Sequence, residues 1–376
     1  MKVVLAPDSF KESMSAAEAA AAMARGVREV LPDATCIEVP MADGGEGTTE
    51  ALVDALGGEW RSVSSVDALG RRITARYGLT PDGLAVIEVA ATVGIGQIAP
   101  AERDVMAASS IGVADLVRDA LDAGATRLIV GLGGSATTDG GAGLLAGLGA
   151  VWLAADGAVL APTPTALAAL DRVELSGLDP RLAGVTIDLA CDVTNPLLGP
   201  SGSAAVFGPQ KGATPEQVPV LDGMLARIAD ALVAAGAPEV REVPGAGAAG
   251  GLGAALLSLG GRRRRGVEVV AEAAGLAAHV EGADLVLTGE GSIDSQTLAG
   301  KTPAGVAEVA GRFGVPVIAF AGRLGDDADV LVGNGFAAVV PITTGPCDLP
   351  TALAEGPANL QRAVATAMRL FSFCSC

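Results

Sequence analysis

The sequence is poor in aromatic residues and in positive charge. Aromatic side chains make up 3% of the 376 residues, too few for the stacking platforms that bind single-stranded bases. The formal net charge is −18, so nucleic acid and anionic membrane surfaces would repel the chain. We therefore expect no nucleic-acid and no membrane partner, and a small anionic substrate would need a locally positive pocket.

Histidine chemistry is nearly excluded, because the chain has a single histidine, His279. It lies in an alanine-rich helical stretch, where a helix-surface position is the simplest interpretation. A Ser-His-Asp triad and histidine-based metal sites are therefore not expected. The five cysteines are odd in number and scattered, with Cys374 and Cys376 on a tail that we expect to be frayed. This usage favours a reduced, cytoplasmic protein.

No long apolar run is present. The longest weakly apolar run, residues 140–155, is shorter than the roughly 20 residues of a membrane span and is rich in glycine. Met1-Lys2 leads into a short apolar run that ends at Pro7-Asp8, which is not the pattern of a secretory signal. The sequence therefore predicts a cytoplasmic protein that spans no membrane.

Lysine is scarce, since only four of the 25 basic residues are lysines. Three of them lie in polar, turn-like stretches: Lys11 in DSFKES, Lys211 in FGPQKGA and Lys301 in LAGKTPAG. A compact ammonium group suits phosphate as a point charge. These three lysines are candidates for anion binding, with solvated loop cations as the alternative.

Both ends of the chain alternate short apolar strands with helices. The first segment has a strand at 2–6, a helix opened by the capping box Ser15-x-x-Glu18 and a second strand near 35–39. The C-terminal part repeats the rhythm with ADLVLTGEG, VPVIAFAGRLG and FAAVVPITTG, and with a helix that has Thr302 as its N-cap. Five strand–helix units predict an α/β fold, a doubly wound parallel sheet of flavodoxin type.

Between residues 59 and 278 the rhythm changes. The stretch from WRSVSS to AVIEVA alternates and turns like an antiparallel meander, and Asp156-Gly157 is typical of a hairpin turn. The run RRRR at 262–265 is interpreted as a solvated loop rather than an anion clamp. We expect a second, mixed α/β domain at 59–278, inserted into a flavodoxin-like domain formed by 1–58 and 279–376.

The strand order of a flavodoxin-type sheet, 2-1-3-4-5, predicts where a ligand binds. Ligands lie beyond the carboxyl ends of the strands where the order reverses, here between the first and third strands. The loops PDSFKES and TGEGSIDSQT would meet there, so that Asp8, Ser9 and Lys11 face Glu290, Asp294 and Gln296. Carboxylates with a lysine at this point favour a phosphate and metal site, and an ordinary ion-paired loop is the alternative.

Four glycine-rich segments lie between apolar stretches: GLGGSATTDGGAG from residue 131, GPQKGA, GAGAAGGLG and the Lys301 loop. Glycine lets the backbone approach phosphate closely, and Ser135 and Thr137 can donate hydroxyl groups. Lys301 before a helix N-terminus adds an anion site. The Walker A motif is absent, and GAGAAG at 245–250 matches the dinucleotide pattern without a clear preceding strand.

Together these segments resemble, in order, the signature segments of bacterial type I glycerate kinases: LAPDSFKES, ADGGEGT, GLGGSATTDGGAG, ACDVTNPLLGPSGSAAVFGPQKGA, GAGAAGGLG and TGEGSIDSQTLAGKTPAGVA. The resemblance covers nearly the whole chain. It implies a two-domain enzyme that transfers the γ-phosphoryl group of ATP to D-glycerate with Mg²⁺, usually at the 2-hydroxyl. Two departures are Glu12, where glycine is usual, and Thr138, where asparagine is usual; Glu12 adds a carboxylate beside Lys11.

The expected site combines cations, carboxylates and backbone amides, because phosphoryl transfer needs positioning and charge neutralisation more than covalent catalysis. Asp192 is the expected base beside the substrate hydroxyl, with a turn-capping role as the alternative. Lys11 is the second catalytic candidate, and Lys11 or Arg323 could offset the glycerate carboxylate. The metal candidates are Glu290 and Asp294, with Asp43 and Asp139 in reserve. The other substrate-binding candidates are Asp8, Ser9, Asp43, Gly44, Gly45 and Asn195. The nucleotide-binding candidates are Gly133, Gly134, Ser135, Thr137, Lys211, Gly289 and Lys301.

Three alternatives to a glycerate 2-kinase stay open at this point. The same reaction could give 3-phosphoglycerate, because nothing in the sequence fixes which hydroxyl is phosphorylated. A non-catalytic nucleotide or metabolite sensor could use the same fold. A nicotinamide dehydrogenase rests only on GAGAAG. The oligomeric state is not readable from the sequence.

Overall fold

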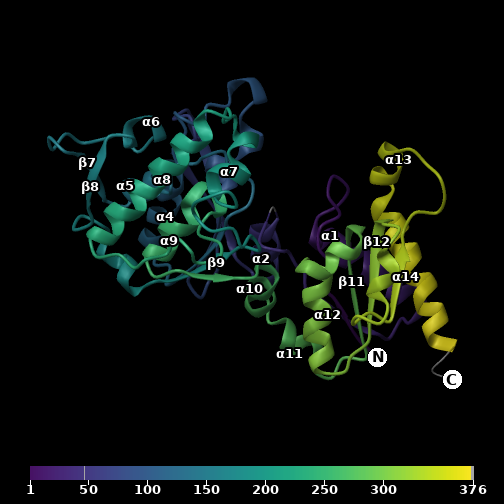
Figure 1. Cartoon of the computed structure of the whole chain (residues 1–376). Coiled ribbons are helices and arrows are strands. Elements are labelled where there is room, and N and C mark those ends of the chain that lie inside the picture. The colour runs from purple at the N-terminus through teal and green to yellow at the C-terminus, as the bar shows by residue number, and fades with distance from the viewer. Residues whose placement is uncertain (46, 374–376) are drawn as a thin grey trace. The chain divides into compact units, whose positions relative to one another are not determined.

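The computed structural model describes residues 1–45 and 47–373, and the chain divides into two compact units. Unit 1 comprises Met1–Asp43, Glu50–Gly57 and Arg265–Cys376, and unit 2 comprises Gly44–Thr49 and Gly58–Arg264. The strands of unit 2 therefore fall, in chain order, between the second and third strands of unit 1 (Figure 1).

Unit 1 is built on a five-stranded parallel sheet. Its strand order is β13-β12-β11-β1-β2, and every neighbouring pair runs parallel. Numbered along unit 1 alone, this order is 2-1-3-4-5, so the predicted flavodoxin-like α/β fold is confirmed. The strands are β1 (Lys2–Leu5), β2 (Thr35–Glu38), β11 (Leu285–Ile293), β12 (Val317–Leu324) and β13 (Ala338–Pro341).

Helices cover both faces of this sheet. α1 packs along α14, and Figure 1 shows α12 and α14 on opposite sides of β11 and β12. The predicted capping box is present, because Ser15 Oγ accepts the Glu18 N–H and the Glu18 carboxylate accepts the Ser15 N–H. α10 and most of α11, which the sequence analysis assigns to the inserted domain, pack on α12. The helices of this part are α1 (Ala16–Val30), α2 (Thr48–Leu56), α10 (Gly266–Ala273), α11 (Leu276–Val280), α12 (Thr302–Arg312), α13 (Leu349–Ala354) and α14 (Gly356–Phe373).

The core of unit 1 lies between the sheet and the pair formed by α1 and α14. Val3 and Leu5 of β1, Leu287 of β11 and Phe320 of β12 are fully buried there, together with Met23 of α1. Each such side chain contributes about 1.5–3 kcal/mol through burial. This packing fixes β1 beside β11, the pair at which the strand order reverses.

Unit 2 has a six-stranded mixed sheet with the order β10-β9-β6-β5-β4-β3. β3, β4 and β5 form the antiparallel meander that the sequence predicts, whereas β5, β6, β9 and β10 run parallel. The carboxyl ends of these four strands therefore meet at one edge of the sheet. The strands are β3 (Glu59–Val66), β4 (Arg72–Leu79), β5 (Leu84–Glu88), β6 (Arg127–Gly131), β9 (Thr186–Ala190) and β10 (Arg262–Arg264).

A two-stranded sheet and seven α-helices complete the described part of unit 2. The predicted turn at Asp156-Gly157 is present, with an antiparallel bridge between Leu153 and Val159. The longer partner of β7 (Val151–Ala154), however, is β8 (Leu170–Glu174). The helices are α3 (Ala90–Val93), α4 (Ile111–Asp122), α5 (Ala142–Gly147), α6 (Pro164–Leu167), α7 (Ser203–Phe207), α8 (Gln217–Ala234) and α9 (Leu252–Ser258).

The arginine run at 262–265 is not the solvated loop that the sequence analysis expects. Its first three residues form β10, an edge strand that runs parallel to β9. Arg264 lies 3.9 Å from Asp188 Oδ2, and Arg263 Nη1 donates to the Cys191 carbonyl oxygen (2.9 Å). A charged edge strand resists pairing with another chain. The arginine run therefore has a structural role at the edge of the sheet.

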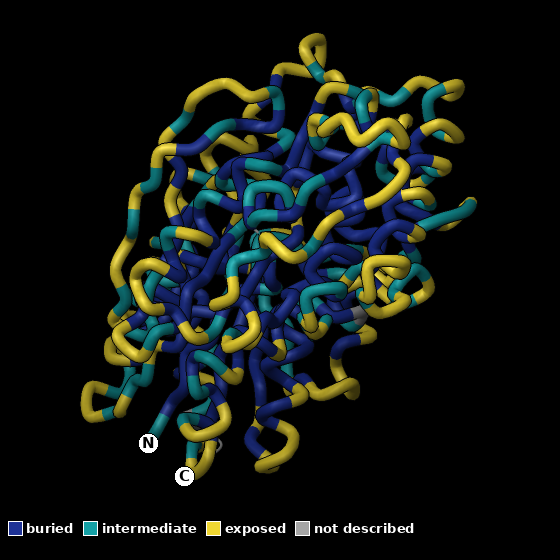
Figure 2. Tube along the Cα trace, turned by 90° about the vertical axis from the view of Figure 1, so that its left-hand side faces the viewer, coloured by how far each residue is buried: buried dark blue, intermediate teal, exposed yellow. Residues whose placement is uncertain are grey.

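Exposed positions concentrate in loops, while buried runs cross the interior (Figure 2). No helix in the described ranges is long and apolar enough to cross a membrane. Cys36, Cys191 and Cys347 are free thiols, whereas the predicted frayed tail with Cys374 and Cys376 lies outside the described residues.

Candidate functional site

Two carboxylates come together at the carboxyl edge of the unit 1 sheet, where β1 and β11 are neighbours. Asp8 N donates to the Gly289 carbonyl oxygen (2.9 Å), and Glu290 is the next residue of β11. Asp43 follows β2 and lies close enough for its negative charge to raise the pKa of both Asp8 and Glu290. The structure therefore brings together the two loops that the strand order predicts at this point.

The pKa of the Asp8 carboxyl group is strongly raised. Thr302 Oγ1 donates to Asp8 Oδ2, and Ser9 N donates to Asp8 Oδ1 (2.6 Å). The pKa is raised from 3.8 to about 7, mainly by burial. The negative charges of Asp43 and Glu290 contribute to the rise, and the bonds from Thr302 and Ser9 oppose it. A carboxyl group with this pKa can accept a proton from a hydroxyl group near neutral pH.

Glu290 is held by a hydroxyl group and an ammonium group. Thr297 Oγ1 donates to Glu290 Oε1 (2.8 Å), and Lys301 Nζ lies 3.6 Å from the same oxygen. Burial raises the pKa of Glu290, and the positive charge of Lys301 opposes the rise. Lys301 Nζ also donates to the Ser292 carbonyl oxygen (3.4 Å), so this ammonium group is fixed beside the start of α12.

The start of α12 differs from the prediction by one residue. The sequence predicts Thr302 as the N-cap, but the N-cap is Lys301 and the helix begins at Thr302. Thr302 is fully buried, and its hydroxyl group donates to Asp8 instead of capping the helix. No side chain in the described chain caps the first turn of α12, an arrangement that suits anion binding at its N–H groups.

The other predicted residues of unit 1 lie around this edge. Lys11 and Arg323 are exposed. Glu12 has φ 63°, a left-handed conformation that glycine adopts freely and glutamate only with strain. Asp294 caps a short 3₁₀ turn by accepting the Gln296 N–H (2.9 Å). Its predicted role as a metal ligand stays a prediction.

Asp139 closes the glycine segment 131–141 that follows β6 in unit 2. It accepts from Ser110 N and Ser110 Oγ (both 2.7 Å) and from Gly141 N and Gly143 N (both 3.1 Å). The side chain is fully buried, and burial raises its pKa against these hydrogen bonds. Both carboxylate oxygens are therefore engaged inside the protein, so metal binding by Asp139 would have to displace these donors.

Lys211 is buried beside the same segment. Its side chain is 2% exposed, and Nζ donates to the Thr137 carbonyl oxygen (2.6 Å) and to Ser135 Oγ (3.1 Å). Burial lowers the pKa of Lys211 to about 7, and the negative charge of Asp139 opposes this shift. The hydroxyl oxygens of Thr137 and Thr138 are buried without a hydrogen-bond partner in the described chain. The ammonium group thus lies inside the loop rather than on an exposed surface.

The glycines at 245–253 are required for packing against segment 131–141. A Cβ on Gly250 would lie 1.9 Å from the Thr137 carbonyl oxygen, and Gly140 N donates to Gly250 O (2.9 Å). Residues 235–247 form no strand, so GAGAAG lacks the strand that precedes a dinucleotide fingerprint. These glycines let two loops touch, and the dehydrogenase interpretation loses its structural support.

The predicted glycine loops around residues 44 and 133 lie next to each other in unit 2. A Cβ on Gly131 would lie 2.8 Å from the Gly44 carbonyl oxygen, and a Cβ on Gly133 would lie 3.6 Å from Gly45 Cα. Ile95 N donates to Gly134 O (2.7 Å). In unit 1, a Cβ on Gly289 would lie 2.3 Å from the Phe320 carbonyl oxygen, so tight strand packing accounts for that glycine.

Asp192 and Asn195 follow β9 at the carboxyl edge of the unit 2 sheet. Asp192 is exposed, and Asn195 Nδ2 donates to the Ser201 carbonyl oxygen (2.7 Å). Glu88 ends β5 at the same edge and accepts the Thr49 N–H (2.8 Å). Because β5, β6 and β9 are parallel, Asp192, Asn195 and Glu88 lie at the same carboxyl edge of the sheet as the glycine segment.

Four side chains that lie among the candidate residues were not predicted as site residues: Thr302, Thr297, Ser110 and Glu88. Thr302, Thr297 and Ser110 hold Asp8, Glu290 and Asp139 through their hydroxyl groups. Serine and threonine give little signal in a sequence, because they are common in loops and at helix starts. Glu88 could have been recognised from one feature of the sequence: it is a carboxylate directly after the apolar run LAVI.

Replacing Asp139 by Ala is expected to lower the free energy of unfolding of unit 2 by about 3–5 kcal/mol. The change leaves the donors of Ser110, Gly141 and Gly143 unpaired and removes the carboxylate near Lys211. Urea unfolding followed by tryptophan fluorescence measures this loss, because Trp60 and Trp152 both belong to unit 2.

The matched control for this prediction is Asp156→Ala. Asp156 is exposed, and its carboxylate accepts the Ala158 N–H in a surface turn. We expect a change below about 0.5 kcal/mol there. Equal effects of the two substitutions would contradict the view that Asp139 organises the glycine segment.

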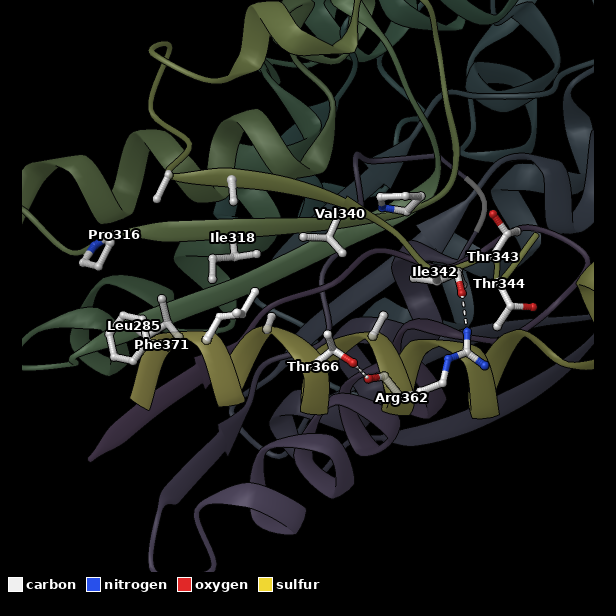
Figure 3. A pocket seen from close by; sticks show the side chains of 16 residues that line it. Leu285, Pro316, Ile318, Val340, Ile342, Thr343, Thr344, Arg362, Thr366 and Phe371 are labelled. Atoms are coloured by element: carbon white, nitrogen blue, oxygen red, sulfur yellow. Dashed lines mark hydrogen bonds between the residues drawn. The ribbon is translucent and has the colours of Figure 1, made fainter. Parts of the chain in front are cut away.

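A cavity of about 580 Å³ lies elsewhere in unit 1, between α14 and the outer strands β12 and β13. Figure 3 shows Leu285, Pro316 and Phe371 at one end, and Arg362 with Thr343 at the other. None of the predicted site residues lines it. The chemistry proposed below therefore does not depend on this cavity.

Comparison with known proteins gives one consistent result over the whole chain. A profile described as "Glycerate kinase family" matches residues 3–372. A glycerate 2-kinase of Escherichia coli (strain K12) is 45% identical over 365 residues, 96% of each chain. A glycerate kinase of Bacillus subtilis (strain 168) is 45% identical over 364 residues, 96% of this chain and 95% of the relative. A crystal structure from Salmonella typhimurium LT2, described as a glycerate kinase 2, has a TM-score of 0.92 at 45% identity and covers 100% of this chain and 99% of that one.

The doubly wound sheet, the glycine loops and these likenesses define an α/β enzyme of the small-molecule kinase class. The chain belongs to the glycerate kinase family. The resemblance drawn from the six sequence segments is therefore confirmed, and as a member of a kinase family the chain uses ATP.

Proposed function

We propose that this chain transfers the γ-phosphoryl group of ATP to the 2-hydroxyl group of D-glycerate, giving 2-phosphoglycerate and ADP. One observation carries the proposal: Asp8, with a pKa of about 7, stands at the switch point of the flavodoxin-like sheet. The choice of the 2-hydroxyl is supported by the Escherichia coli relative, which is named glycerate 2-kinase and is 45% identical.

Asp8 is the base that we favour. Its carboxylate would accept the proton of the substrate hydroxyl, and the oxygen would form a bond to the γ-phosphorus. The bond between that phosphorus and the β–γ bridging oxygen breaks, and ADP leaves with the electron pair. Asp192, the base proposed from the sequence, is exposed at the end of β9. It remains the alternative, and the Asp8→Asn and Asp192→Asn variants distinguish the two.

The cations at the unit 1 edge have separate proposed roles. Lys11 and Arg323 are exposed, so either could pair with the glycerate carboxylate, with Ser9 and Asp43 as further substrate contacts. Lys301 is fixed beside the uncapped start of α12 and would contact a phosphate group. In unit 2, the backbone of the loop at Gly133 would bind the nucleotide, with Lys211 acting through that loop.

Magnesium binding is proposed at Glu290, with Asp294 or Asp43 beside it. Among the described residues, no three His, Cys, Asp or Glu side chains form a group that could hold a metal ion. Mg²⁺ in kinases needs only one or two carboxylates, because phosphate oxygens and water complete its shell. Burial raises the pKa values of Asp8 and Glu290, and the negative charge of Asp43 adds to both shifts, so a bound cation would relieve this repulsion. The ion would neutralise charge on the transferred phosphoryl group.

The experiment that tests this function is a coupled assay with ATP, Mg²⁺ and D-glycerate, in which enolase converts the product. Immediate enolase turnover without phosphoglycerate mutase would mean 2-phosphoglycerate. Turnover only with the mutase would mean the 3-phosphate, the first alternative. ATP binding without turnover in either condition would favour a non-catalytic sensor. A cytoplasmic location and the absence of nucleic-acid and membrane partners remain predictions.

Replacing Thr302 by Val is expected to move the rise of kcat with pH to a higher pH. The Thr302 hydroxyl group lowers the pKa of Asp8 from the value that burial alone would give, so its removal raises that pKa further above 7. A base is active only when it is deprotonated, so the acid limb shifts upward while kcat above pH 8.5 stays within about threefold.

The matched control for the pH profile is Thr366→Val. Thr366 donates to the Arg362 carbonyl oxygen within α14 and touches none of the proposed site residues. The profile of this variant should overlay the wild-type profile. An unshifted profile for Thr302→Val would remove Asp8 as the titrating base.

A further inference from the structure

Lys211 is an internal cation of unit 2. Moving an ammonium group out of water costs several kcal/mol, which is repaid only when its partners are well placed. Yet the side chain is 2% exposed and ends among loop residues of the 131–141 segment. A buried charge in this position points to a role in binding.

The backbone around Ser135 is fixed by other contacts. Gly94 and Ser135 form an antiparallel bridge. Ile95 N donates to Gly134 O (2.7 Å), and Ala136 N donates to Val93 O (2.8 Å). These bonds hold the residues on both sides of Ser135 and do not involve Lys211, whose ammonium group instead contacts Ser135 Oγ and the Thr137 carbonyl oxygen.

The hydrogen bond from Lys211 determines what the Ser135 hydroxyl group can do. Nζ donates to Ser135 Oγ at 3.1 Å, so this oxygen accepts and its own O–H is left to donate. No acceptor for that O–H is present in the described part of the chain. The residue is 4% exposed, and the positive charge beside Oγ makes its proton a stronger donor.

We propose that Ser135 donates a hydrogen bond to an anionic phosphate oxygen of the nucleotide, and that Lys211 is the positioning residue that orients and polarises this hydroxyl group. The inference rests on the proposed function and names the donor in that same site. The ligand class follows from the chemistry: a negatively charged oxygen matches a polarised O–H donor beside a cation. Lys211 itself acts through Ser135 and touches no ligand.

A double-mutant cycle on the full-length chain tests this pairing. Ser135→Ala and Lys211→Met should each raise KM for ATP by about tenfold and weaken Mg-ATP binding in calorimetry by a similar factor. The double variant should be no worse than either single variant, because both changes remove the same bond to the ligand. The value of kcat should change less than threefold. Lys2→Met, which removes a half-buried lysine bonded to the Glu281 carbonyl oxygen, is the matched control with unchanged KM.

A purely structural role for Lys211 would give a different outcome. Additive effects of the two substitutions, or an unchanged KM in Lys211→Met, would overturn the inference. If Lys211→Met does not fold, Ser135→Thr against Ser135→Ala decides, because only the threonine retains the hydroxyl group and should retain ATP affinity. Wild-type ATP binding without glycerate phosphorylation would refute the proposed function alone, since calorimetry with Mg-ATP still measures the effect of Ser135.

Discussion

Replacing Asp8 by Asn is expected to lower kcat by about 10²–10⁴-fold, the usual contribution of a general base. Asn keeps the shape of the side chain and an oxygen that can accept from Thr302 or Ser9, but it cannot take a proton from the substrate. Steady-state kinetics at pH 8 measure the loss. KM for ATP should change little, because Asp8 is proposed to contact the substrate hydroxyl group rather than the nucleotide.

The same variant should be more stable than the wild type at high pH. In the folded chain the pKa of Asp8 is raised from 3.8 to about 7. The stability that this group contributes is present below about pH 4 and is lost as the pH rises through 7, because ionisation favours the unfolded chain. Asn does not ionise, so Asp8→Asn should gain up to about 4 kcal/mol at pH 8 and little at pH 4. Thermal unfolding followed by circular dichroism at both pH values measures the gain.

Asp192→Asn is the companion variant. If Asp8 is the base, kcat of Asp192→Asn should fall by less than about tenfold. Relative to the wild type, Asp192→Asn should not show the gain in melting temperature at pH 8 that is expected for Asp8→Asn. The reverse pattern, a large loss of kcat in Asp192→Asn with a mild effect in Asp8→Asn, would assign the base to unit 2 and contradict our account.

Replacing Gly250 by Ala is expected to lower the free energy of unfolding of unit 2 by more than about 3 kcal/mol. The new Cβ would lie 1.9 Å from the Thr137 carbonyl oxygen, a backbone atom that cannot rotate away. That carbonyl oxygen also accepts from Lys211 (2.6 Å), so the loop must shift and ATP affinity should fall as well. Urea unfolding read by tryptophan fluorescence, together with Mg-ATP calorimetry, checks both effects.

Gly124→Ala separates steric overlap from backbone strain. Gly124 has φ 87° and Gly250 has φ 73°, so both substitutions place alanine in a left-handed conformation. No atom lies within 4 Å of a Cβ built on Gly124, so its cost should be about 1 kcal/mol. If Gly250→Ala were as mild as this control, the loops 131–141 and 245–253 would not be packed as described.

The sequence allowed the architecture of unit 1 to be predicted because that architecture follows from local patterns. Apolar strands, the capping box at Ser15 and the alternation with helices indicate a doubly wound sheet, and its reversal point brings Asp8 to Glu290. In unit 2 the meander also followed from alternation along β3, β4 and β5. Periodicity of this kind depends on neighbours in the chain.

The features that could not be predicted depend on partners far away in the chain. The sequence predicts Thr302 as a helix cap. Its hydroxyl group instead bonds Asp8, 294 residues away in the chain, and no local pattern indicates such a bond. The segment GPQKGA predicts Lys211 as a loop cation, because nothing in these residues indicates that the side chain is buried. The arginines of β10 were predicted as a loop because a run of charged residues is usually exposed to solvent. In the structure they form an edge strand. In each case tertiary packing, rather than local preference, decided the outcome.

The most direct test of our account is the glycerate-dependent release of ADP by the purified chain and by Asp8→Asn, with enolase present to detect the product. We predict ATP turnover that requires D-glycerate, yields an immediate enolase substrate, and falls by at least about 10²-fold in Asp8→Asn. Absence of glycerate-dependent ADP release by the wild-type chain, or full activity in Asp8→Asn, would contradict it.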